Sequence, residues 1–199
     1  MDRVKILFVS ANPAGTLQLK LDKEAREIEA KIRAAEYRDS LELITKWAVR
    51  PDDLLQALNQ HQPHIVHFSG HGNPTEEIVL LDELGKAKPV STKALVHLFR
   101  TLKDNIRVVV LNACFSRPQA EAIAGEIDCA IGMMREIGDD AAITFAASFY
   151  RAIGFGRSIK RAFDTGITAL LLDGSPEDKA PVLIGGKNTA PDKVFLINP

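Results

Sequence analysis

The segment "IVHFSGHG" at residues 65–72, together with "VVVLNACFS" at residues 108–116, decides the fold. In each segment an apolar run, typical of a buried strand, ends in a polar side chain: His71 in the first and Cys114 in the second. The second run is apolar at every position from 108 to 111, which favours a strand buried on both faces of a parallel sheet. The two segments therefore predict two buried strands with a reactive side chain at the end of each.

Strand-like runs alternate with stretches of helical period along the chain. Asp22 and Ser91 are the predicted N-caps of two helices, Pro51 opens a third, and Trp47 is predicted to pack in the core. A small hairpin is expected around residues 83–85. The predicted strands are 4–9, 41–49, 64–68, 107–112, 181–185 and 193–197, and late helices are predicted by apolar stripes within 142–153 and 159–170. This alternation predicts an α/β fold, with a mostly parallel sheet covered by helices on both faces.

Length and composition limit the functions that the chain can perform. Its 199 residues suit a single domain over 1–199, and 46% hydrophobic residues, 26% charged residues and a net charge of −1 leave no basic surface for nucleic acid or an anionic membrane. No apolar run is long enough to span a membrane, and the N-terminus lacks a signal-peptide pattern. With only Cys114 and Cys129, we expect a cytoplasmic protein without a disulfide framework, in which Cys129 is a buried strand residue.

The positions of His71 and Cys114 suggest chemistry. Open parallel sheets gather functional groups beyond the carboxyl ends of their strands, and an imidazole there can convert a thiol into a thiolate nucleophile. A helix is predicted just after Cys114, with Ser116 as its N-cap and Pro118 in its first turn. Its positive end would point toward the sulfur, and Arg117 would add positive charge.

Two other interpretations remain open. A cysteine at a strand end can be a small core residue, and a histidine between glycines can be a turn residue. The same fold would then serve as a non-enzymatic ligand-binding or protein-docking module. A metal site formed by His67, His71 and Cys114 is the other alternative, but their spacing matches no zinc pattern. No phosphate-loop motif follows the first strand either. We expect no metal and no cofactor.

The two segments resemble the His and Cys motifs of the caspase-like cysteine peptidase superfamily, in particular its CHAT branch. There one strand ends in His-Gly, and a later strand ends in a small residue followed by Ala-Cys-x-Ser; here these motifs are "HFSGHG" and "LNACFS". The blocks "KILFVSANP", "WAVRPDDLLQAL", "AIGMMREIGDDAAITFAASFYRAI" and "APVLIGG" are also similar to CHAT domains. The resemblance implies a caspase-like three-layer α/β/α sandwich over nearly the whole chain.

The resemblance also implies roles for individual residues. Cys114 would be the nucleophile, His71 the general acid and base, and the backbone N–H groups of Gly72 and Cys114 the oxyanion hole. The implied activity is that of a cysteine endopeptidase, which hydrolyses peptide bonds in protein substrates through an acyl-enzyme. A His–Cys dyad suffices in this superfamily, and no third member is evident in the sequence.

By the same resemblance, the pocket for the side chain before the scissile bond maps onto Ala11, Asn12, Asn112 and the segment 133–140. Caspases that cut after aspartate carry arginine and glutamine at the first and second of these sites, and this chain has neither. Cleavage after aspartate is therefore not expected. Asp139 and Asp140 could favour a basic residue, although a helix N-terminus also favours acids, and we prefer that structural role.

The resemblance implies a biological setting as well. Bacterial domains of this kind commonly act as effectors in defence, including antiviral defence, or in cell-death signalling. The 199 residues contain no recognisable sensor module, so we expect an activating sensor module or partner protein. Low basal activity is expected, with the loops near 11–20 and 133–140 ordered on activation.

Overall fold

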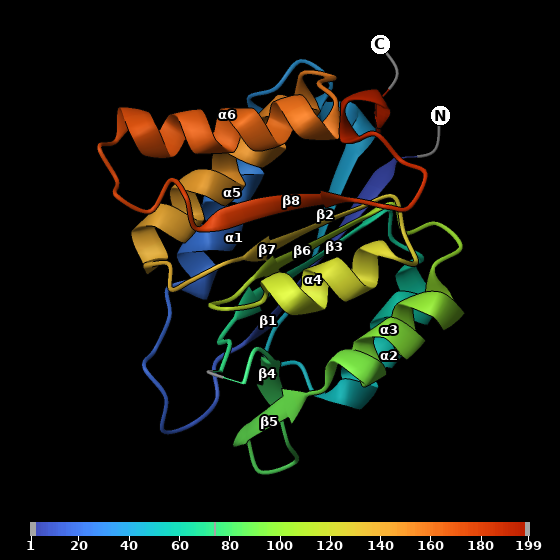
Figure 1. The fold of residues 1–199 in the computed structure, drawn as a ribbon, viewed down its shortest axis with the longest axis vertical. Coiled ribbons are helices and arrows are strands. Elements are labelled where there is room, and N and C mark those ends of the chain that lie inside the picture. Colours follow the sequence, from blue (N-terminus) through green and yellow to red (C-terminus); the bar gives the residue numbers. More distant parts are fainter. Residues whose placement is uncertain (1–2, 74, 198–199) are drawn as a thin grey trace.

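The chain forms a six-stranded sheet between two layers of helices, with a two-stranded hairpin at one edge (Figure 1). This computed structural model describes residues 3–73 and 75–197. The strands are β1 (Val4–Ala11), β2 (Leu41–Lys46), β3 (Ile65–Gly70), β4 (Ile78–Leu81), β5 (Ala87–Val90), β6 (Val108–Asn112), β7 (Cys129–Met133) and β8 (Pro181–Gly185). The helices are α1 (Leu21–Arg33), α2 (Pro51–His61), α3 (Thr92–Leu102), α4 (Arg117–Ala124), α5 (Asp139–Gly154) and α6 (Ile159–Leu172).

The central sheet has the order β2-β1-β3-β6-β7-β8. All neighbours are parallel except β7 and β8, which are antiparallel. The order changes direction at β1, whose successor β2 lies on one side and β3 on the other. Ligand sites of open α/β sheets form beyond the strand ends next to such a point. The predicted fold class, a mostly parallel sheet covered on both faces, is confirmed.

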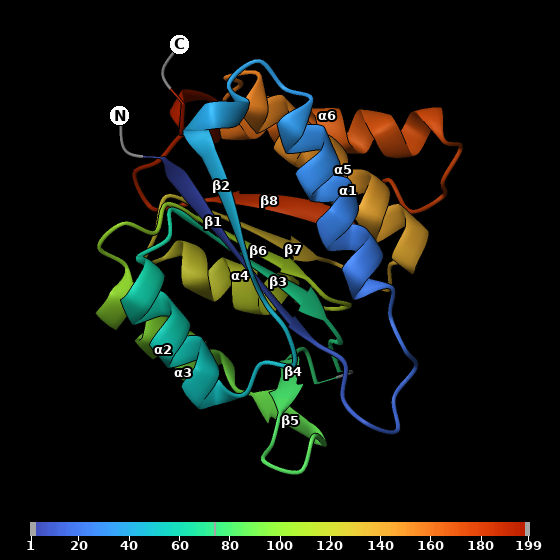
Figure 2. The same ribbon diagram turned by 180° about the vertical axis from the view of Figure 1, so that it is seen from behind.

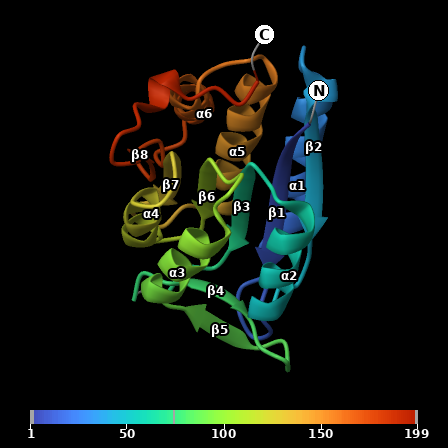
Figure 3. The ribbon, with the colours of Figure 1, turned by 90° about the vertical axis from the view of Figure 1, so that its right-hand side faces the viewer.

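Helices α1, α5 and α6 cover one face of the sheet, and α2, α3 and α4 cover the other (Figures 1 and 2). Figure 3, turned by 90°, spreads the strands of the sheet side by side from β2 to β8. Successive side chains of a strand point to opposite faces, so Val108 and Val110 pack under the first layer while Val109 and Leu111 pack under the second. This double burial explains the uninterrupted apolar run in β6. Within the described part of the chain, no helix has both the length and the hydropathy to cross a membrane.

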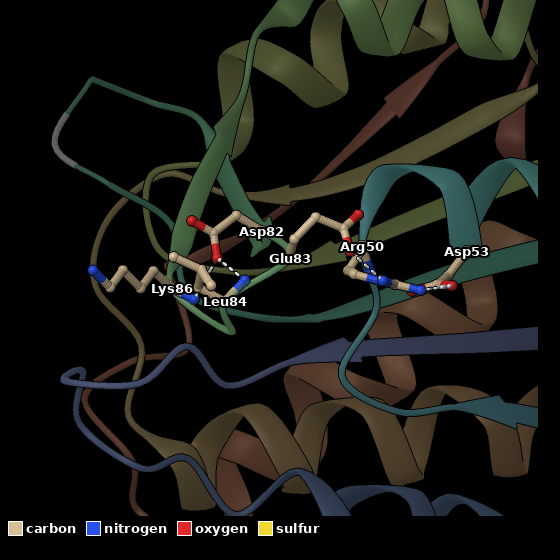
Figure 4. Close-up of polar contacts among 6 residues, drawn as sticks. All are labelled: Arg50, Asp53, Asp82, Glu83, Leu84 and Lys86. Atoms are coloured by element: carbon tan, nitrogen blue, oxygen red, sulfur yellow. Dashed lines mark hydrogen bonds and ion pairs between the residues drawn. The ribbon is translucent and has the colours of Figure 1, made fainter.

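The predicted hairpin is present as β4 and β5, paired antiparallel. The Asp82 carboxylate closes its turn by accepting hydrogen bonds from the backbone N–H groups of Leu84 and Lys86, both at 2.8 Å (Figure 4). These bonds favour the ionised carboxylate and lower the pKa of Asp82.

An ion-pair chain joins this turn to the start of α2. The Arg50 guanidinium donates to Glu83 in the turn (2.5 Å) and to Asp53 in the first turn of α2 (2.9 Å), as Figure 4 shows. Both carboxylates raise the pKa of Arg50, and the hydrogen bond from Arg50 lowers the pKa of Asp53. Helix α2 begins at Pro51, as predicted. The Ser91 hydroxyl likewise caps α3 as predicted, because it accepts a bond from Ala94 N–H (3.3 Å).

The predicted N-cap at Asp22 is wrong. Helix α1 begins at Leu21, and Asp22 lies in the first turn, where its carboxylate pairs with Arg26 one turn later (2.7 Å). The predicted core position of Trp47 is also wrong. This residue follows the edge strand β2 and is 49% exposed, with its ring tilted against Phe8.

The predicted strand at 193–197 does not form. A 3-10 turn occupies Pro191–Lys193, and the buried residues that follow are Val194 and Ile197, three positions apart. A strand would bury every second side chain instead. The Val194 carbonyl accepts a bond from Ile159 N–H at the start of α6 (2.9 Å), so this apolar segment packs against the α5–α6 layer.

Candidate active site

A pocket at the carboxyl edge of the sheet contains both His71 and Cys114. It lies between the ends of β3 and β6 and the starts of α1 and α5. The space open to the centres of water-sized spheres is about 50 Å³. Other lining residues are Glu24, Ser69, Gly70, Asn112, Ala113 and Asp139. The structure thus places the histidine and the cysteine singled out from the sequence at one cavity.

His71 is held at the end of β3 by its backbone and by its ring. Its carbonyl accepts a bond from Val79 N–H in β4 (3.0 Å). Its Nε2 lies 2.8 Å from the carbonyl oxygen of Leu17, in the loop between β1 and α1. Because a carbonyl only accepts, Nε2 carries the proton and the lone pair of the neutral ring is on Nδ1. The Leu17 carbonyl therefore orients the imidazole.

Cys114 stands on a tight turn between β6 and α4. The next residue, Phe115, has a positive φ of 57°, a conformation that bulky side chains rarely adopt and that clusters at functional sites. The Cys114 thiol donates a long, weak bond to the carbonyl oxygen of Ile137 (3.8 Å). In the described part of the chain the thiol has no hydrogen bond to His71.

Helix α4 begins directly after this turn, at Arg117, as the sequence indicated. Ser116 is the N-cap residue, as predicted, but its side chain makes no capping hydrogen bond to the helix. Its hydroxyl donates to the Leu111 carbonyl (2.9 Å) and accepts from Met133 N–H (3.0 Å), tying the end of β6 to β7. The Arg117 guanidinium is paired with Glu121 on the helix surface (2.7 Å), so its charge is partly neutralised there.

The backbones of Gly72 and Cys114 are in direct contact. A Cβ built on Gly72 would lie 1.8 Å from the Cys114 carbonyl oxygen and 3.2 Å from its backbone nitrogen. Any side chain would therefore force these segments apart. Close approach requires this glycine; its φ is not positive.

Gln119 helps to hold the Gly72 and Cys114 segments together. Its fully buried side chain accepts a bond from Ile78 N–H in β4 (2.9 Å) and donates to the Val90 carbonyl at the end of β5 (2.7 Å). Ile78 in β4 forms a β-bridge with Gly72, and Gln119 lies on α4. Gln119 therefore connects the hairpin that follows His71 to the helix that follows Cys114. A backbone-binding glutamine has no distinctive pattern in one sequence, and sequence reasoning missed this residue.

A buried polar network forms the floor of the pocket. The Glu24 carboxylate of α1 accepts bonds from His67 Nε2 (3.0 Å), the Ser69 hydroxyl and Asn112 Nδ2 (2.6 Å). The Tyr150 hydroxyl lies 3.0 Å from His67 Nδ1. Burial, and secondarily the charge of Glu24, raises the pKa of Tyr150 well above its ordinary value.

The sequence did contain a signal for this network. Glu24 interrupts the apolar stripe of α1 three positions after Leu21, while His67 and Ser69 interrupt the β3 run on one face. Polar residues at core positions of several elements indicate a shared buried site.

The residues predicted for the substrate pocket divide into two groups. Asn112 and Asp139 line the pocket, and Asp139 accepts a bond from Lys20 N–H (3.1 Å). Ala11, Asn12 and Asp140 do not line it. Ala11 is buried at the end of β1, and Asn12 braces the β1–α1 loop by exchanging two bonds with Leu19 (3.0 and 3.2 Å). The Asp140 carboxylate pairs with Lys23 and Lys20, whose bonds lower its pKa.

The alternative of a metal site gains no support. Among residues 3–73 and 75–197, no group of three or more potential ligands is close enough to hold a metal ion. Both ring nitrogens of His67 are engaged by Glu24 and Tyr150. Cys129 is a buried strand residue, as predicted, and burial followed by the charge of Asp128 raises its pKa to about 12.

Comparison with known protein families shows which family the chain belongs to. The family model of the CHAT domain matches residues 2–178. The chain belongs to the CHAT domain family. It is 29% identical over 181 residues to a Roc-COR-CHAT protease of an unknown prokaryotic organism and 25% identical over 169 residues to a probable protease of Gillisia limnaea. These alignments cover 87% and 83% of this CHAT domain but only 17% and 30% of the relatives, so it spans less than a third of either.

A solved structure is similar over nearly the whole CHAT domain. The Arg-specific cysteine proteinase gingipain R superposes with a TM-score of 0.66 and 12% sequence identity, over 97% of this chain and 48% of that chain. The fold is therefore caspase-like, as expected. Together, the family and the relatives named as proteases support a peptidase function.

Proposed function

We propose that this chain is a cysteine endopeptidase in which Cys114 is the nucleophile and His71 the general acid and base. The supporting observation is that both side chains line one pocket, where the backbone of Gly72 contacts that of Cys114. Two polypeptide segments far apart in the sequence, one with His71 and Gly72 and the other with Cys114, thus converge with the groups that acyl transfer needs.

The reaction follows from these groups. His71 Nδ1 takes the Cys114 thiol proton, and the thiolate attacks the carbonyl carbon of the scissile peptide bond. The backbone N–H groups of Gly72 and Cys114 donate hydrogen bonds to the developing oxyanion. The imidazolium gives its proton to the departing amine, which leaves a thioester on Cys114. Water, deprotonated by His71, then hydrolyses the thioester and restores the thiol.

The Leu17 carbonyl completes the pair as an orienting group. Its bond to Nε2–H fixes the ring and stabilises the imidazolium that forms during each turnover, as a carboxylate does in a triad. A backbone carbonyl has no side-chain signature, which explains why the sequence offered only two members.

The contacts of the thiol favour a resting state with low activity. Its proton is directed to the Ile137 carbonyl in the segment between β7 and α5. Activation would shift this segment so that the thiol turns to His71. We propose that a sensor module or partner protein drives the shift, since the relatives are much longer chains. By family likeness, the activity would serve bacterial defence or cell-death signalling in the cytoplasm.

Labelling with a peptide acyloxymethyl ketone tests this function directly. The reagent should modify Cys114 selectively, as read by intact mass and peptide mapping, and Cys114→Ala should abolish the modification. Cys129→Ala is the matched control and should label like the wild type. If Cys114 reacts no faster with peptide reagents than with iodoacetamide, and no faster than Cys129, the fold serves as a non-enzymatic module instead.

A further inference from the structure

The pocket beside Cys114 is narrow. Its 50 Å³ for the centres of water-sized spheres corresponds to about three to five waters, since each needs about 10–15 Å³ in this measure. Such a space admits a slender head group on a methylene stem and excludes an aromatic ring. Because the pocket adjoins the nucleophile, it receives the side chain of the residue that precedes the scissile bond.

The floor of this pocket contains a carboxyl group. Glu24 is 3% exposed and accepts bonds from His67, Ser69 and Asn112. A carboxylate has about four acceptor sites, so one remains for a ligand.

Both ring nitrogens of His67 are engaged, Nε2 by the Glu24 carboxylate (3.0 Å) and Nδ1 by the Tyr150 hydroxyl (3.0 Å). The ammonium groups of Lys20 and Lys23 bond Asp140 at the surface. Among the described residues, Glu24 therefore pairs with His67 and with no lysine or arginine side chain.

A second acceptor lies beside it. Asn112 is 5% exposed, and its Oδ1 is buried without a hydrogen-bond partner in the described structure. The amide orientation is fixed by Glu24, because the flipped form would turn Oδ1 toward the carboxylate. Buried polar atoms are almost always paired, so this oxygen awaits a donor. At the rim, the Asp139 carboxylate adds a further acceptor.

We propose that Glu24 and Asn112 select a lysine or arginine side chain before the scissile bond. This inference rests on the proposed peptidase function and names its substrate class. A guanidinium or ammonium would donate to the remaining acceptor site of Glu24 and to Asn112 Oδ1. Asp139 adds a second carboxyl group to the pocket lining, whereas Asp140 does not line the pocket and pairs with Lys20 and Lys23. Glu24 and Asn112 are specificity residues that act on the substrate side chain; neither takes part in the proton transfers.

Peptide acyloxymethyl ketones that differ only in this side chain test the proposal. Arginine is compared with citrulline, its uncharged isostere, and lysine with norleucine; the readout is the second-order rate of Cys114 labelling. The basic reagent of each pair should react at least about 30-fold faster than its neutral partner, as expected where a buried polar site would be left unpaired. The two pairs also show which of the two cations is preferred.

Variants then assign the selectivity to Glu24. Glu24→Gln keeps the shape and removes the charge, and the Ser69 hydroxyl can rotate to accept from the new amide. The arginine-to-citrulline ratio should fall below about 5, because the arginine reagent loses the carboxylate acceptor. Glu29→Gln, on the same helix but paired with Arg33 at the surface, should leave the ratio unchanged. Asn112→Leu supplies an independent variant and should also lower the ratio.

The outcomes separate this inference from the proposed function. Fast labelling by citrulline or norleucine reagents, equal to that by their basic partners, would overturn the basic specificity and leave the peptidase assignment standing. Failure of every peptide reagent to label Cys114 would overturn both. The wild-type comparison decides the specificity even if Glu24→Gln does not fold.

Discussion

Gly72 lies so close to Cys114 that a single added Cβ would stand 1.8 Å from the Cys114 carbonyl oxygen. Two strand ends are thereby brought together, one followed by a histidine and the other by a cysteine. The contact sets the geometry in which two backbone N–H groups can face the same oxyanion.

Replacing Gly72 by alanine should therefore strongly reduce the reactivity of Cys114 toward peptide reagents. The new methyl group must push the backbones apart, so we expect Gly72→Ala to lower peptide-reagent labelling of Cys114 by about 100-fold or more. Gly138→Ala is the matched control. Its Cβ would come no closer than 3.4 Å to the Glu177 carboxylate, an ordinary contact, and labelling should hardly change. Equal effects of the two substitutions on Cys114 labelling would show that Gly72 has no special role in the active site.

The hydrogen bond between His71 and Leu17 predicts a specific tautomer. The neutral ring of His71 should be the Nε2–H form, because Nε2 donates to the Leu17 carbonyl. Nitrogen-15 NMR of the labelled protein distinguishes the two tautomers through their ring couplings. A predominant Nδ1–H form would contradict the assignment of Nδ1 as the base.

The network below the pocket depends on Tyr150. Tyr150→Phe removes the donor to His67 Nδ1 and leaves a buried acceptor unpaired, so we expect the free energy of unfolding to fall by about 1–3 kcal/mol. Urea denaturation measures this loss. Tyr37→Phe, at a half-exposed tyrosine, should change stability by less than about 0.5 kcal/mol. Similar losses in both variants would indicate that the Tyr150–His67 bond contributes nothing.

The two cysteines should differ sharply in reactivity. Burial raises the pKa of Cys129 to about 12, so its thiol stays protonated at pH 8 and should resist iodoacetamide in the native protein, while Cys114 reacts. In the unfolded chain Cys129 ionises at its ordinary, lower pKa. Its burial therefore stabilises the fold fully below that value, and this contribution is lost as the pH rises toward 12. Native mass labelling at pH 7–9, with urea as the unfolded control, checks the contrast; rapid native labelling of Cys129 would contradict it.

Much of the architecture was predictable, because the local sequence pattern is enough where a segment is buried in the same way along its whole length. The β6 run, buried on both faces, and the hairpin after His71 are examples. The prediction failed at 193–197, where an apolar segment meets a helical layer instead of a strand partner, and at Trp47, beyond an edge strand. The apolar residues of a segment do not by themselves specify which other element that segment packs against.

The site was predictable only in part. His71 and Cys114 stand out at strand ends, and Asn112 and Asp139 line the pocket as the resemblance suggested. Glu24 was missed because the helix was predicted from its apolar stripe, and an acidic residue within that stripe was given no weight. The Leu17 carbonyl has no side-chain signature at all, since any residue could supply it.

The central claim, that His71 activates Cys114 toward peptides, is tested most directly by the pH dependence of Cys114 labelling. The rate of modification by a peptide acyloxymethyl ketone is measured from pH 6 to 9 for the wild type, His71→Ala and His97→Ala, the last replacing a histidine on α3 outside the pocket. The account predicts that only His71→Ala slows labelling, by about 100-fold or more over this pH range, because the thiol then lacks the base that removes its proton. Superimposable profiles for the three proteins would contradict it.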